Sequence, residues 1–414
     1  MAEQHEKALV PQIRFTGFTD PWEQRKLSST CEQLSRTINP LETPNEEFTE
    51  YSMPAFDNNE TAETVIGNSM NSLRKIVDRP CLLVNKLNVR KKRIWHVPRP
   101  EANAVCSSEF VPFSSHSSDL SFIKISLLSE RITAYLESCS SGSSNSQKRV
   151  TPEIIMSSEI IAPSLAEQRR IGAFFDRLDS LITLHQRKCD KLCVLKKSML
   201  DKMFPKGGSL YPEIRFAGFT DPWEQRKLEN YVVVSTTKNV DSKFGKEDVL
   251  SVSGEYGVVN QITFQGRSFA GASVSNYGVV NTGDVVYTKS PLNSNPYGII
   301  KVNKGIPGIV STLYAIYHPR DNVYANFIQV YFEQHERMNN YMHPLVNKGA
   351  KNDMKVTAEN ALKGMVTFPS REEQYVISAF FSRLDSLITL HQRKYCGVVS
   401  WMLGVALVRL SSEK

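Results

Sequence analysis

The side chains with the clearest chemical potential are basic and amide residues that occur in four clusters. Each cluster combines Lys or Arg with Asn or Gln: Lys86, Asn88, Arg90, Lys91, Lys92, Arg93 and Trp95; Asn145, Gln147, Lys148 and Arg149; Lys289, Asn293, Asn295, Lys301 and Lys304; Asn347, Lys348, Lys351, Asn352 and Lys355. Lys and Arg suit phosphates and guanine edges, whereas Asn and Gln suit adenine edges. A solvated polar loop explains any single cluster equally well. Recurrence at matched positions in both halves of the chain favours DNA contacts.

No pattern of residues indicates catalysis. The sequence has no Gly-x-x-x-x-Gly-Lys-Ser/Thr loop, no His-Glu-x-x-His and no Gly-x-Ser-x-Gly elbow. Ser294–Tyr297 resembles the Asn-Pro-Pro-Tyr loop of amino-methyltransferases but lacks its second proline, so a turn is expected there. His185 and His391 occupy matched positions without Cys or carboxylate at ligand spacing, which favours polar seam residues over a metal site. We therefore expect no catalytic residues and no bound metal.

Composition indicates an ordinary globular protein. The chain has 414 residues and a formal charge of +7, which permits a nucleic-acid partner without requiring one. Its seven cysteines are odd in number and irregularly spaced, as expected of reduced thiols in a cytosol. The polar N-terminus is no signal peptide, and the apolar run Tyr395–Leu410 is short for a bilayer span. We expect a cytoplasmic protein without a membrane segment.

Two sequence repeats divide the chain into tandem halves. Pro11–Leu27, here called the opening motif, recurs as Pro212–Leu228 with only two differences. The motif contains glycine and proline breakers and three aromatic residues, so we expect it to pack locally on each half rather than bind a ligand. A second repeat relates Leu165–Lys188 to Arg371–Lys394. A period of this length indicates domain duplication rather than a solenoid.

The second repeat predicts two long helices. Ser164–Glu167 and Ser370–Glu373 have the pattern of capping boxes, in which the Glu side chain reaches back to the cap. Apolar positions in Ser164–Phe204 follow three-and-four spacing, which predicts a coiled-coil seam and an antiparallel pair related by a pseudo-twofold axis. Three aspartates among arginines are expected to form surface ion pairs along the helices: Asp176, Asp179 and Asp385.

The regions between the repeats differ in sequence but are expected to be mixed α/β globules. A weak echo relates Val84–Lys86 to Tyr287–Lys289, and another relates Gly142–Glu153 to Gly349–Glu359. The predicted fold class is α/β (mixed α+β), with recognition domains at 1–160 and 207–368 and spacer helices at 161–206 and 369–414. A duplicated frame with different contents predicts two recognition surfaces of similar geometry and different specificity.

The opening motif and the helix sequence together resemble the specificity subunits of type I restriction–modification systems. The resemblance extends to about Lys394. It implies two target-recognition domains that each read half of a split double-stranded DNA site, with the helices as spacer. It also implies a non-catalytic subunit that assembles with two adenine methyltransferase subunits and with restriction subunits. S-adenosylmethionine, ATP and Mg²⁺ would then be bound by those partners, and this chain would hold no cofactor.

For the interface with partner subunits, the expected residues are aromatic or apolar side chains of the opening motif and the helices: Trp22, Trp223, Phe174, Phe175, Leu178, Leu181, Phe380, Phe381, Leu384 and Leu387. Two alternatives remain open at this point. One is a protein-interaction scaffold whose long helices are the function, and the other is a fused restriction or methyl-transfer enzyme, which the missing motifs disfavour.

The sequence departs from the family pattern after Lys394. The Lys-rich amphipathic continuation of the first helix has no counterpart there, and Gly397 and Gly404 enter an apolar run. We therefore expect a replaced terminus, with the second helix ending near Lys394 and pairing only in part.

Overall fold

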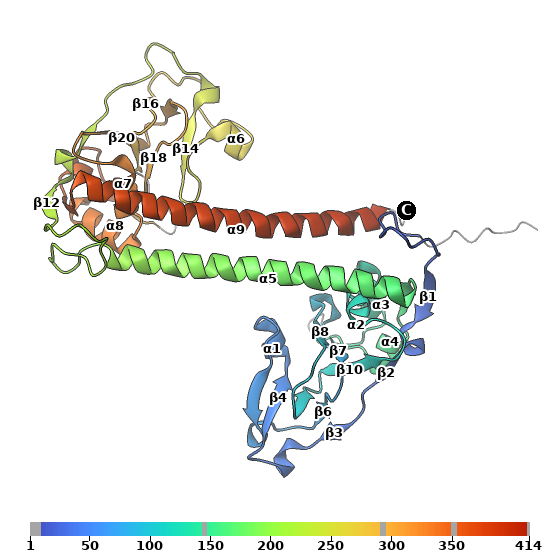
Figure 1. The fold of residues 1–414 in the computed structure, drawn as a ribbon. Helices are drawn as coiled ribbons and strands as arrows, with labels where there is room; N and C mark the ends of the chain where they lie inside the picture. The colour runs from blue at the N-terminus through green and yellow to red at the C-terminus, as the bar shows by residue number, and fades with distance from the viewer. Residues whose placement is uncertain (1–9, 143–146, 290–294, 349–353, 412–414) are drawn as a thin grey trace, which may run out of the picture. The chain divides into compact units, whose positions relative to one another are not determined.

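The computed structural model describes residues 10–142, 147–289, 295–348 and 354–411, with the backbone alone at 347–348, 354–355, 396 and 398–411. The chain forms two compact units, Met1–Leu184 with Tyr395–Lys414 and His185–Lys394. Figure 1 shows the elements of both. Among the described residues, no helix is long and apolar enough to cross a membrane.

The first unit contains two sheets of more than two strands. An antiparallel sheet has the order β2 (Cys31–Gln33), β10 (Phe110–Ser115), β7 (Cys81–Asn85) and β8 (Ile94–Val97). A mixed sheet has the order β3 (Thr37–Ile38), β6 (Arg74–Ile76), β9 (Ala104–Cys106), β4 (Glu47–Tyr51) and β5 (Glu63–Ile66). The opening motif supplies β1 (Glu23–Lys26), which pairs with β11 (Glu159–Ala162). The helices are α1 (Met53–Asp57), α2 (Leu120–Leu127), α3 (Glu130–Ser138), α4 (Pro152–Met156) and the start of α5 (Leu165–Lys202).

The second unit repeats the four-stranded sheet in the order β13 (Val232–Val234), β20 (Tyr314–Pro319), β17 (Val285–Thr288) and β18 (Ile300–Val302). β12 (Glu224–Lys227) pairs with β23 (Met365–Phe368), as β1 does with β11. The remaining strands form pairs: β14 (Leu250–Ser253) with β15 (Gly257–Asn260), β16 (Gly278–Val280) with β19 (Gly308–Val310), and β21 (Asn347–Lys348) with β22 (Met354–Lys355). Its helices are α6 (Gln261–Gln265), α7 (Ala325–Tyr331), α8 (His335–Met342) and most of α9 (Arg371–Ser411). The predicted mixed fold class is confirmed.

The opening motif packs on the unit that follows it, as predicted. Arg14 donates two hydrogen bonds to the buried carboxylate of Glu167, at 2.8 and 2.7 Å, and Arg215 does the same to Glu373. Phe15 meets Phe174 edge to face with ring centroids 5.8 Å apart, and Phe216 meets Phe380 at the same separation. The two copies of the opening motif therefore make the same contacts with the starts of the two long helices.

These contacts correct one detail of the predicted capping boxes. The serine halves are present, since the N–H of Glu167 donates to Ser164 Oγ (3.5 Å) and that of Glu373 to Ser370 Oγ (3.3 Å). The Glu side chains, however, bind the arginines of the opening motif rather than the cap backbone. A guanidinium offers two charge-assisted bonds at once, which is stronger than one bond to a backbone N–H.

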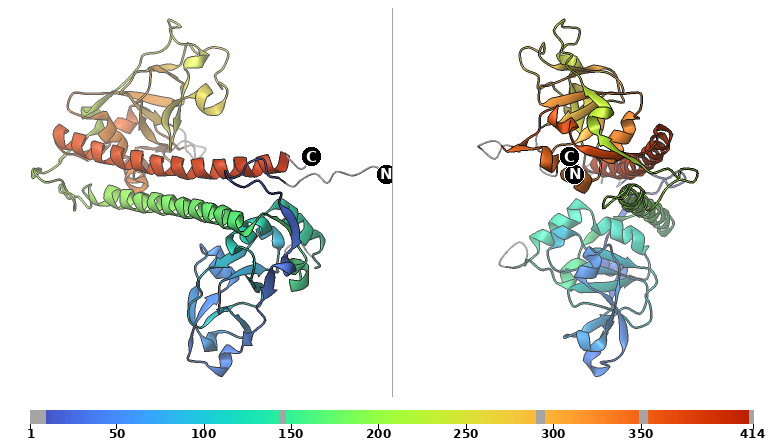
Figure 2. Two further views of the ribbon diagram at one scale, coloured as in Figure 1. Left: turned by 45° about the vertical axis from the view of Figure 1, so that its right-hand side comes forward. Right: turned by 90° about the vertical axis from the view of Figure 1, so that its left-hand side faces the viewer.

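The two long helices pair within the second unit. The C-terminal part of α5 and the first part of α9 run side by side in both views of Figure 2. The contacts run antiparallel, because His185 meets His391 and Lys196 meets Asp385. Leu200 of α5, and Phe204 just after this helix, join Phe381 and Leu384 of α9 in the buried core of this unit. The predicted antiparallel pair is thus confirmed for this part of the helices.

The expected end of the second helix near Lys394 is wrong. α9 continues to Ser411, past Gly397 and Gly404. A single glycine within a helix costs only about 1 kcal/mol relative to alanine, so two of them in a long helix do not stop it.

Candidate nucleic-acid interface

Lys86 and Lys289 occupy the same place in the two units. Each follows a central strand, β7 or β17, and each is half-buried. The N–H of Lys86 donates to the carbonyl of Glu109 just before β10 (2.9 Å), and that of Lys289 donates to Leu313 just before β20 (3.1 Å). Burial lowers the pKa of Lys289, and Glu359 partly offsets this. The sequence echo at these lysines therefore reflects a shared backbone arrangement.

The turn that follows Lys86 is held by several hydrogen bonds. The N–H of Asn85 donates to the carbonyl of Arg93 (3.0 Å), and the N–H of Leu87 donates to Asn85 Oδ1 (2.6 Å). Asn88 and Lys92 both have positive φ, of 52° and 47°. Left-handed backbone at residues other than glycine costs of order 1–3 kcal/mol and concentrates at functional sites.

Three of the four consecutive basic residues of this turn have different partners. Arg90 and Lys91 are exposed, and Arg90 pairs with Glu137 at 2.5 Å. Lys92 turns back to the carbonyl of Leu128 (3.0 Å) and to Glu130, while Arg93 pairs with Asp57. Lys92 and Arg93 therefore hold the turn in place, which leaves Arg90 and Lys91 as its outward cations.

The prediction that Trp95 contacts DNA is wrong. Its side chain is only 4% exposed and packs among Tyr51, Phe56 and Phe110 in a core of the first unit. Burial of a large aromatic surface is the stronger demand on this side chain, so Trp95 stabilises the fold instead of meeting DNA.

The structure brings the second cluster against the first. The N–H of Asn88 donates to the carbonyl of Lys148 (2.9 Å), and the N–H of Val150 donates to that of Lys86 (3.1 Å). Arg149 lies between Leu87 and Ser141 in two antiparallel bridges, and its guanidinium is 3.1 Å from Glu109. Gln147 is exposed beside it, and Asn145 lies outside the described residues. Two clusters distant in sequence thus form one basic face.

The corresponding face of the second unit is described only in part. The N–H of Gly298 donates to the carbonyl of Asn295 (2.9 Å), so the turn predicted around Pro296 is present. Lys348 pairs with Met354, and Asn347 with Lys355, across β21 and β22. Three predicted contacts lie outside the described residues: Asn293, Lys351 and Asn352.

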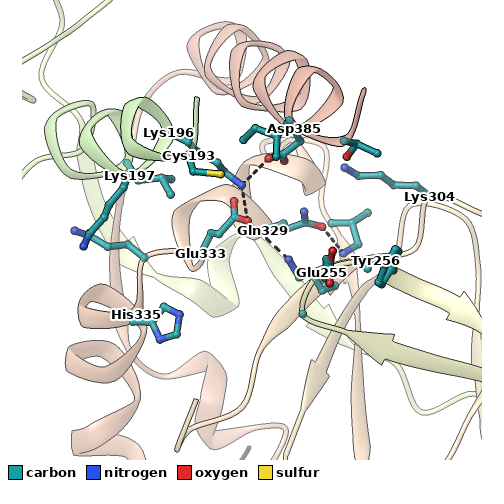
Figure 3. Close-up of a pocket in the computed structure, with 18 of the residues that line it drawn as sticks. Cys193, Lys196, Lys197, Glu255, Tyr256, Lys304, Gln329, Glu333, His335 and Asp385 are labelled. Atoms are coloured by element: carbon teal, nitrogen blue, oxygen red, sulfur yellow. Dashed lines mark hydrogen bonds and ion pairs between the residues drawn. The ribbon is translucent and has the colours of Figure 1, made fainter. Parts of the chain in front are cut away.

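Lys301 does not belong to that face. It lines a cavity of about 860 Å³ inside the second unit, between the helix pair, the β14–β15 hairpin and β18. Figure 3 shows Lys196 of α5 reaching both Glu333 and Asp385, at 2.8 and 2.6 Å. Lys301 lies 3.9 Å from the same Glu333, and burial lowers its pKa. This charge cluster ties both helices to the globular part of the unit.

The aspartates and histidines of the helices have specific partners. Asp385 pairs across to Lys196, and Asp176 accepts from Ser121 Oγ at 2.6 Å, so the prediction of surface ion pairs along one helix is wrong for both. His185 Nδ1 lies 2.9 Å from His391 Nδ1, as expected of seam residues. Within the described parts of the chain, no three His, Cys, Asp or Glu groups are placed to hold a metal ion.

The predicted subunit-interface residues divide by exposure. Trp223, Phe381 and Leu384 are buried in the core of the second unit, so their predicted interface role is wrong. Five of the predicted interface residues are half-buried: Trp22, Phe174, Phe175, Leu178 and Phe380. Leu181 and Leu387, at matched positions of α5 and α9, are exposed and stay available to a partner.

Sequence reasoning missed the carboxylates of the basic face. Glu109 and Glu137 each hold an arginine of that face, yet they lie far from Arg149 and Arg90 along the chain. An isolated Glu carries no signal of such a role.

The chain is similar to proteins of known family. Residues 20–193 match the family model described as Type I restriction modification DNA specificity domain. The S subunit of a type I restriction-modification system from M. genitalium has 12% identity and a TM-score of 0.55, with 96% of this chain and 98% of that chain covered. This match shows a shared fold.

Two further solved structures are similar over comparable lengths. The HsdS subunit from Thermoanaerobacter tengcongensis has 18% identity and a TM-score of 0.40, with 94% and 96% covered. A chain from a study of complex assembly and conformational transition of the type I R-M system has 17% identity and a TM-score of 0.44, with 93% and 96% covered. The resemblance expected from the two repeats is confirmed: residues 20–193 match the type I restriction-modification DNA specificity domain, and the chain shares its fold with the S subunit from M. genitalium.

Proposed function

We propose that this protein is the sequence-reading subunit of a type I restriction–modification complex. Each unit would read one half of a bipartite double-stranded DNA site. Two methyltransferase subunits and the restriction subunits would supply the chemistry, with S-adenosylmethionine, ATP and Mg²⁺ bound on them. The specificity-subunit family is non-catalytic, and the present chain would position the partner enzymes on DNA.

The matched placement of Lys86 and Lys289 carries this proposal. Both lysines leave the same point of the same four-stranded sheet, yet different loops surround them. A backbone contact that positions the protein can be the same in both units, whereas base contacts must differ. A common frame with different loops therefore suits a reader of two unlike half-sites. The exposed Leu181 and Leu387 lie at equivalent helix positions, which suits two copies of one partner subunit.

An exchange of the second recognition region tests the proposal. Residues 229–368 are replaced by the corresponding region of another specificity subunit, and the methylated sites of cells that carry the complete complex are mapped by methylome sequencing. One half of the methylated sequence should change while the other half and the gap between them stay the same. Reinserting the protein's own residues 229–368 through the same junctions is the control. An unchanged methylation pattern would refute the proposal and favour the scaffold alternative.

A further inference from the structure

Arg149 is fixed on both sides of its backbone. Its N–H donates to the carbonyl of Ser141 (2.8 Å), and its carbonyl accepts from the N–H of Ser141 (3.0 Å). On the other side it lies opposite Leu87 in an antiparallel bridge. The neighbouring bonds, Asn88 to Lys148 and Val150 to Lys86, hold the same segment against the turn that follows Lys86. The Cα of Arg149 is therefore placed as firmly as a residue in a central strand.

The guanidinium of Arg149 is also held. Its Nη2 atom lies 3.1 Å from Glu109 Oε1, although 56% of the arginine side chain is exposed. The Glu109 side chain is 19% exposed, and its Oε2 atom is buried without a hydrogen-bond partner among the described residues. The Glu109 backbone is anchored in turn, since its carbonyl accepts from the N–H of Lys86. A half-buried carboxylate thus contacts one nitrogen of a guanidinium whose side chain is largely open to solvent.

This arrangement suits a base edge better than a phosphate. A phosphate contact requires only a positive charge, which a mobile lysine supplies, and the Glu109 carboxylate would repel a phosphate brought close to it. A planar guanidinium with a carboxylate beside one of its nitrogens can still present two N–H groups to the two adjacent acceptors of guanine, O6 and N7, in the major groove. Adenine presents an acceptor beside a donor there, which an arginine cannot match.

We propose that Arg149 reads a guanine in the half-site bound by the first unit, and that Glu109 acts as its positioning residue. The inference rests on the proposed function and adds a specific base and a specific pair of side chains to it. Arg90, which pairs with Glu137, lies in a 3-10 turn without strand-type bonds on either side, so its backbone is not fixed as that of Arg149 is.

The test uses the complete complex and a set of duplexes in which each base pair of the first half-site is changed in turn. Arg149→Lys keeps the positive charge but removes the planar group that can donate two parallel hydrogen bonds. It should lower discrimination at one G·C position by about five- to 150-fold, and leave the other half-site and the salt dependence unchanged. Glu109→Gln should relax the same position to a smaller extent. Lys91→Ala, an exposed cation on the adjoining turn, is the control and should weaken binding equally on every duplex.

Three outcomes would overturn the inference. Equal loss of affinity on all duplexes with Arg149→Lys would make Arg149 a phosphate contact, and no change at any position would make it structural. Relaxation at an A·T pair would assign a different base. If Arg149→Lys fails to fold, Glu109→Gln decides by the same criterion. If the exchange of residues 229–368 moves a half-site but neither variant relaxes a position, only this inference fails; if the exchange moves nothing, the proposed function fails as well.

Discussion

The two units share one frame but differ in how the long helices attach to it. In the second unit, Leu200 of α5 and the two residues that follow the helix, Met203 and Phe204, are buried in the core, and Lys196 contacts both Glu333 and Asp385. Lys196 lies beyond the helix repeat, which ends at Lys188 and Lys394, and the sequence after Lys394 has no matching Lys-rich continuation. The first unit has no sequence counterpart of Lys196. The two units therefore share the four-stranded sheet and the opening-motif contacts, while the contacts that attach the long helices differ.

The charged groups of the two units show the same difference. Burial lowers the pKa of Lys196, but Glu333 and Asp385 outweigh it and the pKa is raised. Asp179 stands where Asp385 stands in the repeat. Burial raises its pKa, and Lys124 only partly offsets this. The same aspartate thus has a direct lysine partner in one unit and a weaker electrostatic neighbour in the other.

The largest effect is expected from Phe204→Ala. Phe204 is buried against Trp223, Phe327, Tyr331 and Phe381, and the guanidinium of Arg337 lies 4.2 Å from its ring centroid. The substitution should destabilise the second unit by about 3–5 kcal/mol, as is typical of a truncated buried phenylalanine. Denaturant unfolding monitored by fluorescence measures this.

Val194→Ala on α5, the helix that precedes Phe204, provides the control for Phe204→Ala. Its side chain is 70% exposed, so the change should stay within about 0.5 kcal/mol. Equal effects of the two substitutions would mean that the segment just after α5 is not part of the core of the second unit.

Lys196→Met removes the positive charge and keeps a long, flexible side chain at this position. Loss of the lysine leaves Glu333 and Asp385 without their shared cation, and breaking such a pair is costly because the remaining charges are partly desolvated. We expect a loss of about 2 kcal/mol, below the range for fully buried pairs because Asp385 is partly exposed. Urea unfolding is the measurement, and Lys197→Met, an exposed neighbour, is the control. A loss no larger than that of the control would show that the tie contributes specificity of pairing rather than stability.

The elements that the two units share could be predicted from the sequence because their sequences are repeated. The opening motif, the two helices and the echo at Lys86 and Lys289 recur in sequence, and the structure places the two lysines equivalently. The basic face could be predicted only as a set of residue types. Residues 90–93 are all basic, so the sequence does not distinguish them. In the structure, the two positive φ angles of the turn direct the Lys92 side chain toward the body of the unit and leave Lys91 exposed.

Most of the contacts that could not be predicted from the sequence are ion pairs between residues far apart in the chain. Glu167 has the position of a capping residue, yet it binds Arg14, which lies 153 positions earlier. Glu109 meets Arg149 because two loops converge, and no local pattern encodes that contact. Ion pairs between distant segments depend on tertiary structure, so periodicity and capping rules do not reach them.

Lys86→Ala and Lys289→Ala test whether the two units contact DNA in the same way. If both lysines contact phosphate from the same frame, each substitution should lower affinity uniformly across sequences and reduce the slope of log affinity against log salt by about 1. Binding of the complete complex to its site over a range of salt concentrations is the measurement. A reduced slope for one lysine alone would show that the two frames meet DNA differently, and unaltered binding at every salt concentration would assign both lysines to structure.

The smallest effect is expected at His185 and His391. Their Nδ1 atoms are 2.9 Å apart, so one must carry a proton and the other accept it, and double protonation would leave two donors of like charge face to face. Burial lowers the pKa of His391 below its ordinary value of 6.5, and His185, Lys188 and Lys394 lower it further. The unfolded chain then binds more protons than the folded one as pH falls through that value. The contribution of His391 to stability is therefore complete above about pH 6.5 and is lost in acid.

His391→Gln isolates this contribution, because glutamine can still bond to His185 but does not titrate in this range. Unfolding of the wild type and of the variant at about pH 8 and about pH 5.5 should show a greater loss of stability for the wild type on acidification. Comparing the two proteins cancels the titration of groups that they share. Equal losses would mean that the helix pair accommodates the second proton, for instance by turning one ring outward, and that the matched histidines are a by-product of the duplication rather than a determinant of pairing.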